Sequence, residues 1–120
     1  MRVSLTKDFT FEAAHWLPTF PDGHKCRRMH GHSFRVTIVV EGEVPEDAGY
    51  LIDYGVIKQA IQPVEEQLDH HLLNKIEGLE NPTAENLSRW IWRRIEPNLP
   101  LLAAIRVHET CNNGCEYRGE

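Results

Sequence analysis

The feature that most constrains the fold of this chain is the alternation of apolar and polar residues in its first segment. Between residues 3 and 15, one face holds Val3, Leu5, Phe9, Phe11 and Ala13, and the other holds Ser4, Thr6, Asp8, Thr10 and Glu12. A period of two predicts a β-strand with one buried face. Lys7 interrupts the apolar face, which predicts an outer end of the strand or a β-bulge near this residue.

A second alternating segment runs from about His30 to Glu43. Its inner face is formed by Phe34, Val36, Ile38 and Val40, with Val39 as an exception on the other face. Residues 17–29, between the two strands, contain two prolines and a glycine, which predicts a loop. A loop of this length inside a small domain is usually functional.

Helical spacing then replaces alternation in two segments. Apolar residues recur every three or four positions over 54–68, which predicts a helix with Asp53 as its N-cap and a bend at Pro63. A second helix is predicted to begin near Thr83, which can cap it, and to stop before Pro97.

Two further strands are predicted at about 103–110 and around Tyr117. The resulting order, ββααββ, predicts an α+β fold with a four-stranded antiparallel sheet and two helices on one face. Such a sheet has two open edges, and open edges favour association. We therefore expect a homo-oligomer.

Length and composition exclude several classes of protein. A chain of 120 residues is expected to form a single domain over 1–120. A net charge of −5 argues against general nucleic-acid binding, which requires a basic surface. The sequence contains neither a membrane-length apolar run nor a signal peptide, which predicts a cytoplasmic protein without a membrane partner. Three cysteines are too few for a disulfide scaffold.

Three histidines are predicted to gather at one end of the sheet. His30 and His32 share the inner parity of the second strand, and His15 shares that of the first. If these strands pair antiparallel, the end of the first meets the start of the second. A single inward histidine is more often a hydrogen-bonded core residue, but three neighbouring imidazoles fit a metal with an open position, as in catalytic zinc sites.

Cys26 lies four residues before His30, among the cations Lys25, Arg27 and Arg28. Nearby cations favour the thiolate, which is a base or nucleophile at neutral pH. The same cations are suited to an anionic substrate tail such as a phosphate chain. The alternative is a solvated basic loop with an incidental thiol.

Other candidates are weaker by themselves. Asp69, His70 and His71 follow the first predicted helix, where a carboxylate and an imidazole can relay protons or simply lie favourably at a helix end. Glu109 shares the inner parity of its strand and needs a partner, either a ligand with paired N–H donors or an internal arginine. We interpret Cys111 and Cys115 as turn residues.

Taken together, these residues resemble the tetrahydropterin synthase family. The resemblance spans nearly the whole chain and rests on five blocks: Phe9–His15, Cys26–His32, Leu68–His71, Asn81–Glu85 and Glu109–Glu120. The Cys-x-x-x-His-x-His spacing is specific, because it places a base and a metal in one pocket. The short chain and the Cys-rich ending resemble the bacterial branch that makes 6-carboxy-tetrahydropterin in the queuosine pathway.

The resemblance implies a tunnelling fold that oligomerises into a barrel, as trimers or hexamers with sites between subunits. It also implies that zinc is bound by His15, His30 and His32. Cys26 would be the proton-abstracting base, and Asp69 and His70, with His70 closest to the thiol, would assist in charge relay.

The family resemblance further implies the substrate, dihydroneopterin triphosphate. Glu109 would assist in the charge relay and also anchor the pterin ring, with help from Thr83. The carboxy branch yields 6-carboxy-tetrahydropterin, acetaldehyde and triphosphate, and we expect Lys25, Arg27 and Arg28 to meet the triphosphate. A 6-pyruvoyl-tetrahydropterin synthase and a non-catalytic pterin- or metal-binding protein remain alternatives.

Overall fold

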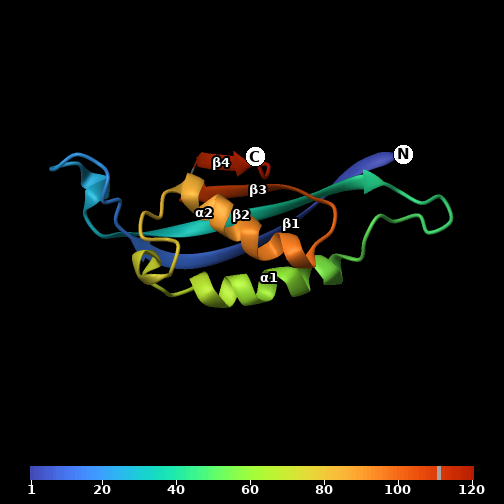
Figure 1. The fold of residues 1–120 in the computed structure, drawn as a ribbon, viewed down its shortest axis with the longest axis horizontal. Coiled ribbons are helices and arrows are strands. Elements are labelled where there is room, and N and C mark those ends of the chain that lie inside the picture. The colour runs from blue at the N-terminus through green and yellow to red at the C-terminus, as the bar shows by residue number, and fades with distance from the viewer. Residues whose placement is uncertain (111) are drawn as a thin grey trace.

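The computed structural model describes residues 1–110 and 112–120, and its elements follow the predicted order (Figure 1). The elements are β1 (Arg2–His15), β2 (His30–Glu43), α1 (Tyr54–Leu68), α2 (Ala84–Ile95), β3 (Leu102–Glu109) and β4 (Asn113–Tyr117). Short 3-10 helices span Lys25–Arg27, Leu73–Lys75 and Glu96–Asn98. The bounds predicted for β1, β2 and α1 are confirmed to within one residue.

The four strands form one antiparallel sheet in the order β1-β2-β3-β4. The register of β1 and β2 is regular from Arg2↔Glu43 to His15↔His30, so the irregularity expected near Lys7 is absent. Lys7 is half-buried, because its long aliphatic stem can lie on the inner face while its charge reaches solvent. The register shift occurs instead between Val39 and Val40, facing β3, where both valines are buried.

Both helices cover the same face of the sheet (Figure 1). The Asp53 side chain accepts a hydrogen bond from the Gly55 N–H at 2.7 Å and caps α1, while Thr83 accepts from the Asn86 N–H and caps α2, as predicted. The core between helices and sheet contains Phe11, Phe34, Ile38, Ile57, Leu68, Leu87, Ile91 and Ile105. The predicted α+β class is therefore confirmed.

The residues that follow α1 cover the outer edge of β1 at one end of the sheet. The Glu12 N–H donates to the Asp69 carboxylate at 2.9 Å, and the Glu12 carbonyl accepts from the His70 N–H at 2.7 Å. Two positions later, the Ala14 N–H donates to the His71 carbonyl at 3.4 Å. The connection between α1 and α2 therefore fixes the end of β1 that carries His15.

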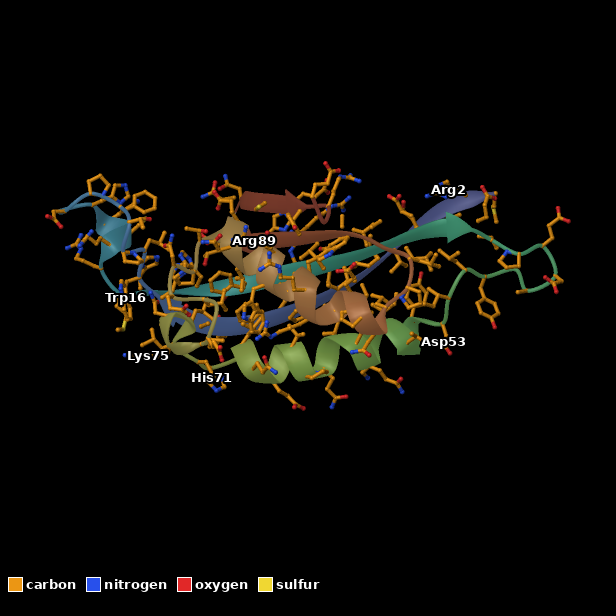
Figure 2. All side chains as sticks on the ribbon, in the orientation of Figure 1. Arg2, Trp16, Asp53, His71, Lys75 and Arg89 are labelled. Atoms are coloured by element: carbon orange, nitrogen blue, oxygen red, sulfur yellow. The ribbon has the colours of Figure 1, made fainter. Side chains whose placement is uncertain are left out.

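The two ends of the elongated molecule differ. Trp16, His71 and Lys75 lie at the end where β1 finishes, and Arg2 and Asp53 lie toward the opposite end (Figure 2). The loop between β1 and β2 extends beyond the sheet at the first of these ends (Figure 1). Among the described residues, no helix has both the length and the apolar character needed to cross a membrane.

Candidate metal centre and adjoining pocket

The three predicted histidines converge where β1 ends and β2 begins. His15 is paired with His30 across the two strands, and His32 is paired with Ala13. The imidazole ring centroids of His15, His30 and His32 are separated by 4.6, 4.8 and 5.1 Å. One nitrogen from each ring lies within 4.8 Å of the others, so the three rings can hold a metal ion.

Hydrogen bonds at Nδ1 orient all three rings in the same way. The Nδ1 of His15 lies 2.9 Å from the Pro82 carbonyl oxygen, and the Nδ1 of His30 lies 2.7 Å from the Arg28 carbonyl oxygen. The Nδ1 of His32 lies 3.0 Å from the Thr110 hydroxyl. Because a carbonyl oxygen only accepts, His15 and His30 donate from Nδ1, which leaves their Nε2 atoms as the ligand atoms. The Thr110 hydroxyl orients the His32 ring so that its Nε2 can serve in the same way.

The environment of His15 supports this arrangement. Its side chain is fully buried, and its Nε2 has no hydrogen-bond partner among the residues that the structure describes. Burial lowers the pKa of His15 from 6.5 to about 4, and burial also lowers the pKa of His32. Both rings are therefore neutral at physiological pH, which is the form that binds a metal, and an ion would satisfy the otherwise unpaired Nε2. The donor set fits a zinc ion bound by three imidazoles.

A cavity of about 400 Å³ places two of the three histidines beside the predicted base and pterin anchor. It is lined by His30, His32, Lys25, Cys26 and Glu109, among others. A carboxylate oxygen of Glu109 lies 3.9 Å from the Nε2 of His32. Burial raises the pKa of Glu109, so a ligand that offers N–H donors would relieve the cost of burying this carboxylate. Two predicted zinc ligands, the predicted base, the predicted pterin anchor and one predicted phosphate-binding cation therefore line the same cavity.

A neighbouring cavity of about 420 Å³ extends the site toward the start of α2. Cys26 and Glu109 line this cavity too, together with Thr83 and two residues that the sequence did not single out as site residues, Glu85 and Cys115. Cys115 lies in β4 and contacts the Ser88 hydroxyl at 3.7 Å, so its interpretation as a turn residue was wrong. Cys111 lies outside the described residues.

Arg27 faces its own loop. Its guanidinium donates to the carbonyl oxygens of Pro18 and Phe20 at 2.7 and 2.8 Å, and it pairs with Asp22 at 3.2 Å. The Nη1 and Nε atoms of Arg27, a residue expected to meet a phosphate chain, are therefore engaged within its own loop. Arg28 is exposed and is not part of the lining of either cavity that contains Cys26.

Asp69 and His70 form a pair, but they do not line the cavities that contain Cys26. The Nδ1 of His70 lies 2.9 Å from the Asp69 carboxylate. The Glu12 N–H, and secondarily His70, lowers the pKa of Asp69. The side chain of His70 is 79% exposed and lines a separate cavity of about 630 Å³, beside Glu12 and Ser33. Within one chain, the expected proximity of His70 to the Cys26 thiol is not observed.

Comparisons with known proteins identify the family and several relatives of this chain. The family profile described as 6-pyruvoyl tetrahydropterin synthase matches residues 4–120. A 6-carboxy-5,6,7,8-tetrahydropterin synthase of Synechocystis is 40% identical over 117 residues, which covers 92% of this chain and 89% of the relative. A dihydroneopterin monophosphate aldolase of Pyrococcus furiosus is 38% identical, over 83% of this chain and 81% of the relative.

Among solved structures, the 6-pyruvoyl tetrahydropterin synthase of Caenorhabditis elegans is similar in fold. It superposes with a TM-score of 0.91 at 24% identity and covers 100% of this chain and 97% of the other. The resemblance seen in the five sequence blocks is thus confirmed by the profile and by the relatives. The chain belongs to the 6-pyruvoyl tetrahydropterin synthase family.

Proposed function

We propose that this protein is a zinc-dependent lyase that converts 7,8-dihydroneopterin triphosphate and water to 6-carboxy-5,6,7,8-tetrahydropterin, with release of acetaldehyde and triphosphate. The observation that carries the proposal is the convergence of three histidine nitrogens within 4.8 Å of one another. Two of these histidines, His30 and His32, line a cavity together with Cys26 and Glu109. The name of the Synechocystis relative supports this choice of product.

His15, His30 and His32 would hold the zinc ion. When bound, zinc supplies a Lewis acid that polarises substrate oxygens and makes adjacent C–H protons more acidic. The Cys26 thiolate would remove such a proton as general base. Glu109 would accept hydrogen bonds from the N–H groups of the pterin ring, and Thr83 would help to position the ring from the start of α2.

Asp69 and His70 would act in the site of a neighbouring subunit. Within one chain they lie at the outer edge of β1, and the His70 side chain is exposed. A second copy that brings its Cys26 loop to this edge would complete the proton relay. We therefore propose a homo-oligomer, a trimer or a hexamer, whose sites lie between subunits.

The triphosphate would meet the basic loop through Lys25, which lines the same cavity as Cys26. Arg28 is exposed and can add charge, whereas Arg27 braces the loop through Pro18 and Phe20. We propose that the product serves queuosine biosynthesis in the cytoplasm. Restoration of queuosine in the tRNA of a strain that lacks the activity would test this role.

Two other reactions compete with this proposal. The 38% identity to the Pyrococcus furiosus protein named dihydroneopterin monophosphate aldolase favours an aldolase acting on the monophosphate, and the family description favours a 6-pyruvoyl product. Incubation of the zinc-loaded protein with the triphosphate and, separately, the monophosphate, followed by mass spectrometry, distinguishes all three. A 6-pyruvoyl product or turnover of the monophosphate alone would replace the carboxy assignment.

A matched pair of loop variants tests catalysis itself. We expect Cys26→Ala to lower turnover by about 10²–10⁴-fold while the zinc content stays unchanged, because it removes only the general base. The control is Met29→Ala, which alters a 61% exposed side chain in the same loop. Full activity of Cys26→Ala would contradict the role of the thiol, and no turnover by the wild-type protein would favour a non-catalytic binding protein.

A further inference from the structure

The main chain just beyond the metal ligand His15 is held by a side chain. The strand pair β1–β2 ends at His15↔His30, so Trp16 has no partner in β2. The side-chain amide of Asn74 takes that place. Its Oδ1 accepts from the Trp16 N–H at 3.0 Å, and its Nδ2 donates to the Trp16 carbonyl at 2.8 Å. Figure 2 shows Trp16 near Lys75, the residue that follows Asn74, at this end of the molecule.

The same amide reaches the segment that orients the His15 ring. The Nδ2 of Asn74 also lies 3.4 Å from the Glu80 carbonyl oxygen. Two residues later, the Pro82 carbonyl accepts the hydrogen bond from the Nδ1 of His15 at 2.9 Å. One side chain therefore connects the backbone next to His15 with the segment that fixes the direction of the His15 ring.

We infer that Asn74 is a positioning residue for the metal centre. Asn74 holds the main chain next to His15 so that the Nε2 of His15 lies close to the Nε2 atoms of His30 and His32. This inference rests on the proposed function, because it assigns Asn74 to the metal site proposed there. The hydrogen bonds of Asn74 go to the main chain of Trp16 and Glu80, and Asn74 does not line the two cavities that contain Cys26. Its effect would pass entirely through the main chain of residues 16 and 80.

The chemistry of the amide explains why this residue type suits the position. Asn74 is 8% exposed, and its contacts require an acceptor for one N–H and donors for two carbonyls. An amide meets both requirements at once. An aspartate of the same size keeps the acceptor but turns a second oxygen, without a proton, toward the carbonyls of Trp16 and Glu80. Repulsion would then move the end of β1 without changing any metal ligand.

The test compares Asn74→Asp with Asn98→Asp. Asn98 is an exposed asparagine in the 3-10 helix Glu96–Asn98, at the opposite end of α2 from Pro82, so this variant adds the same charge without disturbing the segment that orients His15. Zinc affinity is measured on folded protein by competition with a chromogenic chelator, and the visible absorption of the Co²⁺ form reports the ligand geometry. We expect Asn74→Asp to weaken zinc binding about 10- to 100-fold and to change the Co²⁺ spectrum. Asn98→Asp should leave both unchanged.

Each outcome decides a different point. If the wild-type protein binds neither Zn²⁺ nor Co²⁺, the proposed metal site fails, and the role of Asn74 fails with it. If the wild type binds zinc and folded Asn74→Asp binds it within twofold, only the positioning role is overturned. If Asn74→Asp does not fold, Asn74→Ala replaces it, because alanine removes the same bonds without adding charge. Failure of both variants to fold would make Asn74 a requirement of the fold and would also overturn the assignment.

Discussion

The burial of His15 predicts how acid destabilises the metal-free protein. Burial is the main cause that lowers the pKa of His15 from 6.5 to about 4, and the charges of His30 and His32 act in the same direction. The unfolded chain therefore binds a proton at this ring more tightly than the folded chain. The contribution of His15 to the free energy of unfolding is fully present above its unfolded pKa of 6.5, is lost as the pH drops, and stops changing below about pH 4.

The magnitude follows from the two pKa values. A pKa difference of about 2.5, at 1.36 kcal/mol for each unit, limits the loss to about 3.4 kcal/mol. By pH 5, the unfolded ring is almost fully protonated and the folded ring is mostly neutral, so about 2 kcal/mol of the free energy of unfolding is already lost. A bound zinc ion would oppose this loss, because it binds only the neutral imidazole.

Urea unfolding of chelator-treated protein at pH 7.5 and pH 5.0 measures the effect. The control is His15→Leu, which fills the buried site with a group that does not titrate. We expect the wild type to lose about 2 kcal/mol more than His15→Leu between the two pH values, because other titrating groups contribute to both proteins. Equal losses in the two proteins would refute the burial argument.

Three further predictions concern the scaffold and are measured by urea unfolding. Phe34→Ala should cost about 3–5 kcal/mol, because Phe34 is 1% exposed and its ring stacks 4.8 Å from that of Phe11; a cost below 1 kcal/mol would contradict this. Asp53→Ala should cost about 1 kcal/mol through the lost cap of α1, with zinc affinity unchanged. Asp69→Asn should destabilise the protein at pH 7, and its difference from wild type should shrink as the pH falls through the lowered pKa of Asp69; a difference independent of pH would disagree.

Local patterns in the sequence predicted much of the fold and part of the site. Alternation in β1 and β2 places His15, His30 and His32 on the inner face, and the antiparallel register confirms that they meet. The parity of Glu109 likewise predicted an inward carboxylate at a strand end, and Glu109 lines the cavity that contains Cys26. These predictions succeed because the side-chain period of a strand is a property of consecutive residues.

Other features of the site depend on contacts that no local pattern reveals. The sequence placed Arg27 with the phosphate-binding residues, and in the structure its Nη1 donates to loop carbonyls within nine positions of it. The family resemblance placed His70 next to the thiol, and within one chain the connection after α1 holds His70 at the outer edge of β1. Loop conformation decides both cases, and loops have no periodicity to read.

By itself, the sequence determined which residues could form the centre: three inward imidazoles, a thiol four positions before His30, and a carboxylate at a strand end. Only the tertiary structure decided how the rings are aimed, because the partners of His15 and Trp16 lie 67 and 58 positions away, at Pro82 and Asn74. Strand alternation arises from backbone geometry and is visible over a few residues. The direction of the His15 imidazole depends on a hydrogen bond to the connection between α1 and α2. The position of that connection is set only after the helices have packed on the sheet.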